Sequence, residues 1–453
     1  MAGSKVERLG TEPLGRLLWE MSSQTTFSLL MYAIYSVTDT YFLSVGINSL
    51  AAAGSSIISP VLIALGGVAT TVGAGGASVV SRALGEKNPD RAARAVANTF
   101  LIFWAVALVI TVLGAAFIEP IVYLLGATDS IAPYAITYGR IIFLGALVST
   151  GFSSLIRADG NIRFSTMVWV IPIAANTFLC WLFIMVMQMG VAGAALATVI
   201  GGQGVSAVLS MYFFFFRKNR SYQLKRAYFR PDWRLMGEIV IIGFPSLVKS
   251  LSASLVVIIT NNLLRSMGGD GALSVFAIVN RIYSSLNTPK TGVVQGMQPI
   301  LGFNFGQKKF ERVRRTIRLA LSSTTIYGVL ICATSLLFPA ALIGLLSTEQ
   351  AVIAEGQDAL RWMALAYPLG GISVMVAAYF QAVGRAKEAL ILSLGSILLV
   401  KLPVLLFSAS LFSLTGIWTS EAVSETILCI IALLMLRGYQ RQAAAQERLA
   451  FNP

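Results

Sequence analysis

Histidine is absent from this sequence of 453 residues. That absence removes the commonest protein ligand for transition metals and the side chain that titrates near neutral pH, so any proton chemistry must use carboxylates, with Tyr or Lys in support. Only three cysteines are present, Cys180, Cys332 and Cys429, and each falls inside an apolar segment. An odd number of cysteines in such segments gives no disulfide framework. We therefore expect no metal site and no organic cofactor.

Charged side chains are scarce as well. They make up 12% of the residues, and hydrophobic residues make up 56%, whereas a soluble domain has about 25% charged residues. Apolar runs of about 20 residues, the length that crosses a bilayer, recur along the whole chain. The sequence thus predicts an all-α polytopic membrane protein. No cleavable signal peptide is expected, because Leu14 directly begins a full-length span.

Twelve membrane-spanning helices are predicted, over residues 14–45, 50–82, 94–119, 131–157, 164–188, 191–216, 235–266, 272–303, 313–340, 355–384, 388–410 and 415–438. Most of the 34 Lys and Arg residues lie in the two tails and in alternate loops, at 82–94, 157–163, 217–234, 308–318 and 385–387. By the positive-inside rule we expect both termini and these loops to be cytoplasmic, in the plasma (cytoplasmic, or inner) membrane. The net charge of +14 is therefore topogenic and indicates no nucleic-acid partner.

The sequence repeats about its basic middle. RALGEKNPDRAAR at 82–94 aligns with FNFGQKKFERVRR at 303–315, and RADGNIR at 157–163 aligns with QAVGRAK at 381–387. Two six-helix halves of the same orientation follow, an arrangement that places a substrate cavity between them. The predicted organisation is a tail, a first lobe, a linker, a second lobe and a tail, at 1–13, 14–216, 217–234, 235–438 and 439–453. We interpret the linker as topogenic; binding of anionic lipid headgroups is the alternative.

Asp39 is the only carboxylate between Glu20 and Glu86. A carboxylate within an apolar span costs a few kcal/mol on insertion scales, which makes Asp39 a candidate functional residue. A rise of about 1.5 Å per helical residue places side chains from three helices at one level. These candidates for a cation-coupling site are Asp39, Asn176, Cys180 and Thr198, with Tyr35 and Ser36 a turn away. A hydrogen-bonded polar residue at a helix end is the plainer alternative for Asp39.

The second lobe repeats this site with different charges. Glu421 is the repeat counterpart of Thr198, Asn261 is that of Asp39, and Lys401 falls near the counterpart of Asn176. We expect a buried ion pair between Lys401 and either Glu421 or Glu425, because removing one partner of such a pair is costly. The remaining candidates of this charge network are Lys249, which we expect to face the cavity and favour anionic or zwitterionic substrates, Asn262, and Arg281, which contacts either substrate or backbone carbonyls.

These residues lie among motifs of a known family. TDTYF at 38–42, LGEKN at 84–88, FGQKK at 305–309, IRADGNIR, FQAVGRAK and GMQPILGFNFG at 296–306 together resemble the multidrug and toxic-compound extrusion (MATE) transporters, in particular their DinF-like branch. The resemblance implies a V-shaped pair of pseudo-symmetric six-helix bundles that exports lipophilic cations against an inward proton or sodium flow. It maps the cation site onto Asp39, Asn176 and Thr198. Where the family usually has a second carboxylate this chain has Cys180, which favours H⁺ over Na⁺ because Na⁺ prefers hard oxygen ligands.

The resulting expectation is a proton-coupled antiporter that exports amphipathic and xenobiotic organic compounds by alternating access. Its partners would be small organic substrates and the lipid bilayer, and we expect a monomer. The alternatives are a Na⁺-coupled exporter and a lipid-linked precursor flippase of the same superfamily, which would have a more basic cavity. An enzyme is not expected, because the chain lacks histidine, paired aspartates for Mg²⁺ and a nucleophile–base pair, and so has no catalytic residues to name.

Overall fold

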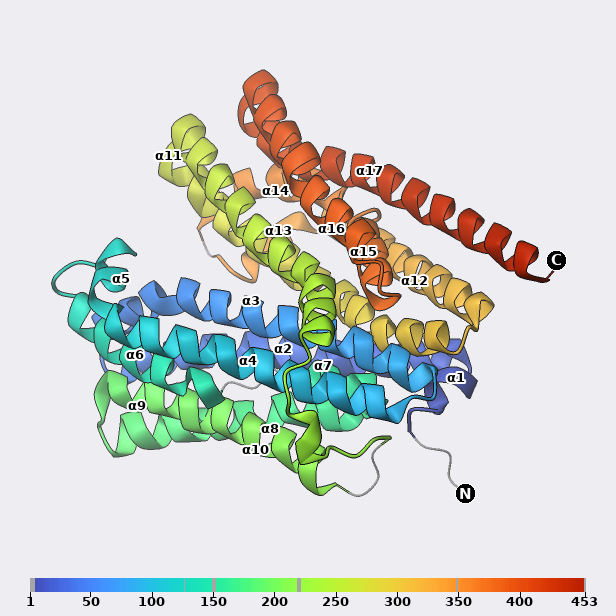
Figure 1. Ribbon diagram of the computed structural model, residues 1–453. Helices are drawn as coiled ribbons and strands as arrows, with labels where there is room; N and C mark the ends of the chain where they lie inside the picture. Colours follow the sequence, from blue (N-terminus) through green and yellow to red (C-terminus); the bar gives the residue numbers. More distant parts are fainter. Residues whose placement is uncertain (1–4, 126, 149–151, 218–220, 348, 452–453) are drawn as a thin grey trace. The chain divides into compact units, whose positions relative to one another are not determined.

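The computed structural model describes residues 5–125, 127–148, 152–217, 221–347 and 349–451, with the side chains of 49, 59–65, 270 and 443–451 outside the described set. These residues are almost entirely helical, and no strand occurs among them (Figure 1). They divide into two compact units. The first comprises the chain up to Leu247 together with Gly302–Lys309, and the second comprises Val248–Leu301 and the chain from Phe310 onward.

The first unit contains the helices before and around the linker. They are α1 (Arg8–Thr11), α2 (Leu14–Gly46), α3 (Ser49–Gly85), α4 (Pro89–Ala116), α5 (Ile118–Leu124), α6 (Ala132–Gly145), η1 (Ala146–Val148), α7 (Ser153–Ala158), α8 (Ile162–Cys180), η2 (Trp181–Val186), α9 (Gly190–Leu196), η3 (Ala197–Gly204), α10 (Val205–Met211), η4 (Tyr212–Phe216), η5 (Arg226–Tyr228) and the two ends of α11 (Trp233–Gly306). Within it α2 packs on α8, and α3 packs on α4 and α6.

The second unit contains the middle of α11 and the helices that follow. They are α12 (Phe310–Leu337), α13 (Pro339–Gly344), α14 (Gln350–Ala364), α15 (Ile372–Ala382), α16 (Ala386–Gly395), η6 (Ser396–Lys401) and α17 (Leu402–Phe451). Its core is apolar and includes Leu264, Phe276, Ile343, Met363 and Trp418.

The predicted helices are present among the described residues, and one of them differs from expectation in its interior. The seventh and eighth are separated at Gly269 within α11, and the last two are separated at Ser413 within α17, and both breaks fall in the predicted connections. The predicted helix 355–384 is instead broken, because α14 ends at Ala364 and α15 begins at Ile372. Seven helices or runs of joined helices are long and apolar enough to cross a membrane among the described residues.

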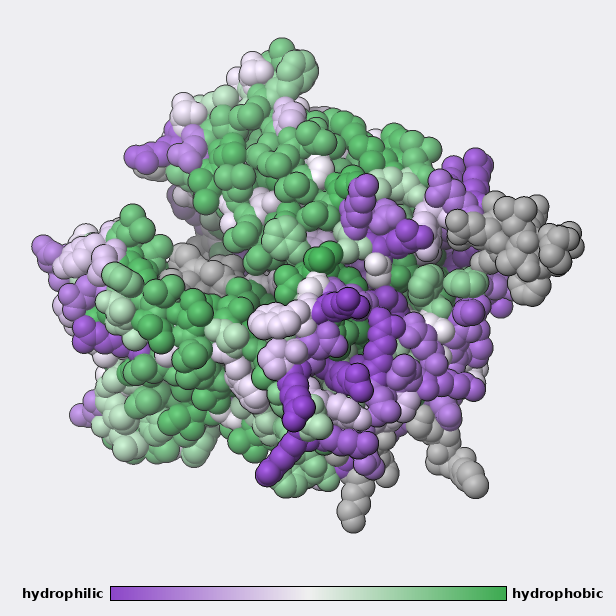
Figure 2. Space-filling view, in the orientation of Figure 1, coloured by the Kyte–Doolittle hydropathy of each residue, from purple (hydrophilic) through white to green (hydrophobic). Residues whose placement is uncertain are grey.

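Side-chain caps fix several helix starts. Asn48, Asn88 and Asp232 each precede a helix, and the side chain of each accepts a hydrogen bond from the backbone N–H three residues later. This contact satisfies one of the donors that a helix leaves unpaired at its first turn. On the face shown in Figure 2, hydrophobic side chains cover the middle of the first unit, and hydrophilic ones gather near the linker and the start of α4. That distribution suits helices that cross a bilayer.

The backbone repeats as the sequence does. Lys87 and Lys308, aligned by the repeat, both adopt a positive φ, of 57° and 59°. Gly160 and Gly384 are likewise aligned and have φ values of 75° and 80°. A residue with positive φ just after a helix closes its last turn, and glycine does so without steric cost. The aligned motifs are therefore matching helix ends.

Glycines at these repeated ends permit close backbone contact within the first unit. A Cβ added to Gly85 would overlap the carbonyl oxygen of Phe303, and a Cβ added to Gly306 would overlap that of Arg82. Phe303 and Arg82 are themselves repeat counterparts, so α3 and α11 exchange the same contact in both directions. Small residues permit this close approach of two helices.

Replacing either of these glycines should separate the two helices. We expect Gly85→Ala and Gly306→Ala each to lower the stability of the protein by about 1–3 kcal/mol, the usual cost of overpacking. Thermal unfolding of the purified protein in detergent measures the effect. Gly237→Ala is the matched control, because a Cβ there meets nothing within 4 Å. Wild-type stability of both variants would contradict the packing described.

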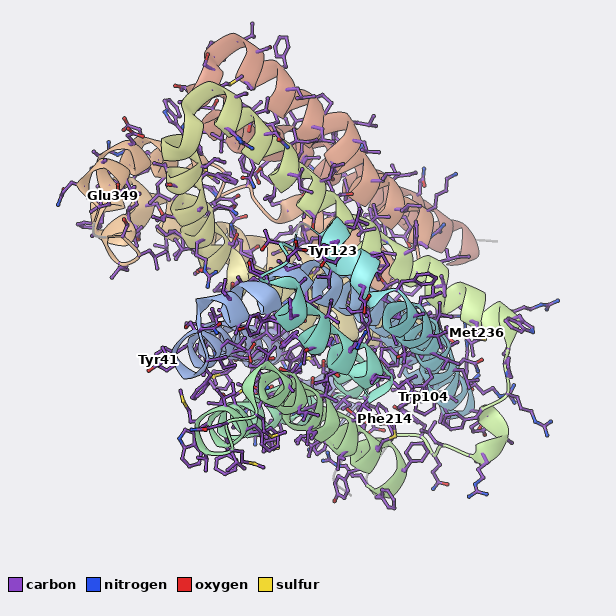
Figure 3. All side chains as sticks on the ribbon, turned by 90° about the vertical axis from the view of Figure 1, so that its left-hand side faces the viewer. Tyr41, Trp104, Tyr123, Phe214, Met236 and Glu349 are labelled. Carbon is purple, nitrogen blue, oxygen red and sulfur yellow. The ribbon has the colours of Figure 1, made fainter. Side chains whose placement is uncertain are left out.

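Aromatic side chains pack at the linker end of the first unit. Trp104 and Phe214, both labelled in Figure 3, lie with their ring centroids 5.3 Å from that of Phe100. Phe152 stacks closer still, at 4.1 Å. These residues come from α4, η4 and the segment before α7, so the cluster joins elements that are far apart in the chain.

Candidate functional site

Asp39 lies in α2, half-buried, beside the last residue of α8. The Sγ atom of Cys180 is 3.6 Å from the Oδ1 atom of Asp39 and 3.6 Å from the Oδ1 atom of Asn176. A thiol has one hydrogen, so Cys180 can donate to only one of these oxygens at a time. The thiol therefore connects a carboxylate on α2 with an amide on its own helix.

The network continues into η3. The Nδ2 atom of Asn176 donates to the hydroxyl of Thr198 over 3.4 Å, and the hydroxyl of Tyr35 lies 3.4 Å from the same Thr198 oxygen. Asn176, Cys180 and Thr198 are almost fully buried, with 1%, 0% and 7% of their surfaces exposed. Five of the six predicted site residues of the first lobe are thus joined in one hydrogen-bonded network, which we call the Asp39 network.

Irregular helix geometry places two of these side chains. Cys180 directly precedes the π-helical turn η2, and Thr198 lies inside the π-helical turn η3. Such turns are rare and occur frequently at functional sites. A Cβ added to Gly201 would overlap the backbone of Asn176, so this glycine allows η3 to approach α8 closely enough for the contact between Asn176 and Thr198.

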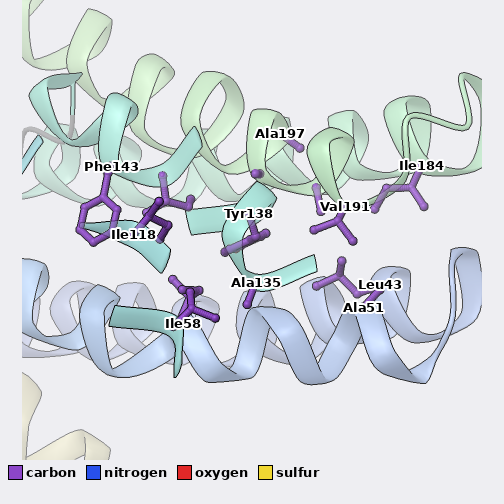
Figure 4. Packing of buried hydrophobic residues seen from close by; sticks show 14 of the residues in the cluster. Leu43, Ala51, Ile58, Ile118, Ala135, Tyr138, Phe143, Ile184, Val191 and Ala197 are labelled. Atoms are coloured by element: carbon purple, nitrogen blue, oxygen red, sulfur yellow. The ribbon is translucent and has the colours of Figure 1, made fainter. Parts of the chain in front are cut away.

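Tyr138 of α6 belongs to this region and was missed by the sequence analysis. Only 2% of it is exposed, and it packs in the buried cluster that contains Cys180. Figure 4 shows it in the hydrophobic cluster that also contains Leu43 and Ala197. A tyrosine in an apolar segment was the only signal available. Ser36, in contrast, is exposed on α2, and among the described residues its side chain makes no hydrogen bond to the network.

No basic side chain forms an ion pair with Asp39 among the described residues. The carboxylate is therefore compensated only by neutral dipoles. No group of three or more Cys, Asp or Glu side chains that could hold a metal ion is found in the part of the chain that the structure describes. The Asp39 network can bind and release a proton at one carboxylate, but its sulfur takes the place of an oxygen ligand for a metal ion.

The second unit contains an ionic cluster. The ammonium of Lys401 lies 2.7 Å from Oε1 of Glu421 and 2.9 Å from Oε1 of Glu425. The sequence analysis left open which glutamate is the partner, and the structure places both there. The hydroxyl of Tyr283 donates to the same Glu421 oxygen over 3.4 Å, and the Tyr283 ring stacks on Tyr367 with centroids 4.9 Å apart. We call Lys401, Glu421, Glu425 and Tyr283 the Lys401 cluster.

The other predicted residues of the second lobe lie on α11, and Lys249 is near enough to Lys401 and Glu425 to interact with their charges. Lys249, Asn261, Asn262 and Arg281 are all exposed. Asn262 donates to the backbone carbonyl of Ile258, within its own helix. Among the described residues none of the four makes a hydrogen bond or an ion pair with the Lys401 cluster. Their predicted roles toward substrate stay predictions.

A family model described as MatE matches residues 25–182 and 245–407, which is most of the chain. This protein belongs to the MATE family. Two similar curated relatives are the multidrug export proteins MepA of Staphylococcus saprophyticus and of Staphylococcus aureus (strain NCTC 8325 / PS 47). The first is 26% identical over 412 residues and 90% of each chain, and the second is 24% identical over 431 residues and 94% of each chain.

Solved MATE structures have the same fold. A crystal structure of MATE in the bent conformation gives a TM-score of 0.92 at 21% identity and covers 98% of this chain and 99% of that one. The outward-facing conformation of a multidrug resistance MATE family transporter of the MOP superfamily gives 0.90 at 20% identity, over 99% of each. The predicted all-α fold, with twelve helices in two pseudo-symmetric bundles, is confirmed.

Membership of the MATE family makes this chain a multi-pass membrane transporter and not an enzyme. Of the residues that the resemblance assigned to the cation site, the structure brings Asp39, Asn176 and Thr198 into one network. The coupling role of these residues is not tested by that arrangement. The DinF-like branch also stays a prediction for this MATE transporter.

Proposed function

We propose that this MATE transporter is a secondary active antiporter that exports amphipathic and xenobiotic organic compounds in exchange for protons. The observation that carries the proposal is the Asp39 network, in which one carboxylate without a basic partner lies among neutral hydrogen-bonding groups. An ionisable residue within a membrane span is costly and therefore marks a functional pathway. The names of the multidrug export relatives support the substrate class. Both termini would be cytoplasmic, in the plasma membrane.

A proton arriving at Asp39 would change the hydrogen bonding of the network. The ionised carboxylate accepts the hydrogen of the Cys180 thiol, whereas the protonated form is itself a donor. Because Oδ1 of Asn176 is equally far from the thiol, at 3.6 Å, Cys180 would turn its hydrogen toward Asn176 when Asp39 is neutral. Each proton thereby removes a charge and rearranges the contact between α2 and α8. The site therefore has two hydrogen-bonding states, one with Asp39 ionised and one with it protonated, and the transporter could alternate between them as it opens to each side of the membrane.

Two alternatives are less well supported. Na⁺ prefers several hard oxygen ligands, and Cys180 supplies sulfur at the centre of the network. A lipid-linked precursor flippase would need a strongly basic cavity for a pyrophosphate, whereas the charge of Lys401 is balanced by two glutamates, Glu421 and Glu425. Exchange of small organic compounds for protons therefore fits both clusters better.

Transport by proteoliposomes tests the proposal. We expect dye export driven by a pH gradient at constant Na⁺, and no export driven by a Na⁺ gradient at constant pH. Cys180→Asp should add a response to Na⁺, because two carboxylates with Asn176 and Thr198 provide an oxygen cage. Cys332→Ser is the control, since Cys332 is a buried cysteine of the other unit. Wild-type transport that requires Na⁺ at fixed pH would refute proton coupling.

A further inference from the structure

A second buried ammonium lies in the second unit, outside the Lys401 cluster. Lys290 of α11 is 3% exposed. Its Nζ atom donates to the backbone carbonyl oxygen of Tyr367 over 2.5 Å and to that of Gly370 over 3.1 Å, and it lies 5.3 Å from the centroid of the Tyr367 ring. Among the described residues no carboxylate forms an ion pair with it. Carbonyl dipoles and one aromatic face therefore contact this charge directly, and the Glu425 carboxylate acts on it from a greater distance.

Those carbonyls belong to the break between α14 and α15. α14 ends at Ala364 and α15 begins at Ile372. Tyr367 and Gly370 lie between these two helix ends, so their carbonyls are outside the regular hydrogen bonding of either helix. Gly371 has a φ of 99°, a left-handed conformation that lets the chain turn between the two helices. The break thus presents carbonyl oxygens where a continuous helix would bond them internally.

The break is also closed to water. Tyr367 is fully buried, and Gly370 is buried beside it. Gly328 of α12 packs so closely that a Cβ there would overlap the Tyr367 carbonyl oxygen. A buried carbonyl without a donor costs free energy, and water cannot supply the donor at such a contact. The site therefore needs a cationic or hydrogen-bonding group from within the protein or from a bound ion.

Transporters with discontinuous helices bind their coupling cations with unwound carbonyls and the C-terminal ends of half-helices. We propose that the break between α14 and α15 is a binding site for a monovalent cation, and that Lys290 fills it with its own ammonium. An ammonium ion matches the chemistry of the site, because it donates hydrogen bonds to carbonyls and is attracted to an aromatic face. In this transporter the site is permanently occupied, so the second lobe requires no free cation there.

The site is connected to the Lys401 cluster. The Tyr367 ring that Lys290 contacts stacks on Tyr283, whose hydroxyl donates to Glu421. Loss of the ammonium would release the Tyr367 backbone and, through the stacked rings, the hydrogen bond to Glu421. A cation in the break therefore helps to hold Tyr283 against Glu421, which is one of the two carboxylates that Lys401 contacts.

Chemical rescue tests the proposal. Lys290→Ala removes the ammonium and leaves space, so the variant purified in choline chloride should unfold well below wild type. Ammonium or methylammonium chloride at the same ionic strength should restore its unfolding temperature saturably, by about 5 °C or more. Potassium and sodium chloride give the ion selectivity of the site. Lys290→Met is the matched control, since its side chain fills the space without charge, and it should be destabilised but not rescued.

The outcomes are decisive in both directions. Saturable rescue of Lys290→Ala alone, with no response from wild type or Lys290→Met, supports a cation site that Lys290 occupies. An equal response of all three proteins would show a general salt effect and overturn the proposal. A Lys290→Ala variant as stable as wild type would also overturn the proposal. So would a Lys290→Ala variant that no cation stabilises, or one that cannot be purified in a folded state in any of these salts. None of these results depends on whether transport is coupled to protons.

Discussion

Asp39→Asn is expected to leave the protein folded and to abolish export driven by a pH gradient, down to the rate of empty liposomes. Asparagine has nearly the same shape and still accepts the hydrogen of the Cys180 thiol, 3.6 Å from Oδ1 in the wild type. It cannot take up a proton, so the step that couples the gradient to transport is lost. Because the variant also removes a charge without a basic partner, its unfolding temperature should equal or exceed that of wild type.

Two controls separate coupling from binding and folding. Ser36→Ala alters the same helix one turn away, at an exposed position outside the Asp39 network, and should export at the wild-type rate. Substrate binding by Asp39→Asn, followed by dye fluorescence in detergent, should persist and lose its dependence on pH. Gradient-driven export by Asp39→Asn at the wild-type rate would show that the coupling carboxylate is elsewhere.

Depth along straight helices was predictable from the sequence. Asp39, Asn176, Cys180 and Thr198 lie far apart in the chain, yet counting about 1.5 Å per residue placed them at one level. The structure joins them because neighbouring spans run parallel or antiparallel and keep that level. The repeat was equally informative. The alignment of the two halves pairs Lys87 with Lys308, and in the structure both residues have a left-handed backbone conformation.

Rotation about each helix axis was not predictable. Ser36 and Tyr138 illustrate the problem: depth favoured Ser36, which is exposed, and gave no reason to choose Tyr138, which is buried in the cluster that contains Cys180. The π-helical turns η3 and η6, which contain Thr198 and Lys401, change the angle between successive side chains, and no residue pattern announced them. Asn261 is exposed on α11 for the same general reason, because its depth was predicted but the direction of its side chain around the helix axis was not.

The helix break that Lys290 occupies was missed for a different reason. Hydropathy averaged over a window that includes Pro368, Gly370 and Gly371 stays high, and it therefore predicts one continuous membrane-spanning helix. Proline followed by paired glycines was the available signal for a turn. Lys290 then appears as an isolated lysine, because its partners are backbone carbonyls rather than acidic side chains. Pairing by opposite charge, which located Lys401 and its glutamates, could not locate this contact.

The Lys401 cluster leads to the second large expected effect, a marked asymmetry between its members. Lys401→Met should destabilise the protein by about 3–5 kcal/mol, because it leaves two carboxylates near each other without a cation. Glu421→Gln and Glu425→Gln should each cost far less, since Lys401 keeps the other glutamate at 2.9 Å or 2.7 Å. Chemical or thermal unfolding in detergent gives the three values, with Lys387→Met, at an exposed position of α16, as the control for the same substitution.

Two double-mutant cycles, which pair Lys401→Met in turn with Glu421→Gln and with Glu425→Gln, then assign the coupling. Combining Lys401→Met with both glutamine substitutions removes every charge of the cluster, and replacement of a whole buried ionic group can be nearly neutral. The combined variant should therefore be more stable than Lys401→Met alone, although it carries more substitutions. Glu425 should contribute the larger coupling, because its side chain is 7% exposed, whereas the Glu421 side chain is 23% exposed and is more strongly screened. Losses that simply add in both cycles would mean that these contacts carry no net interaction energy.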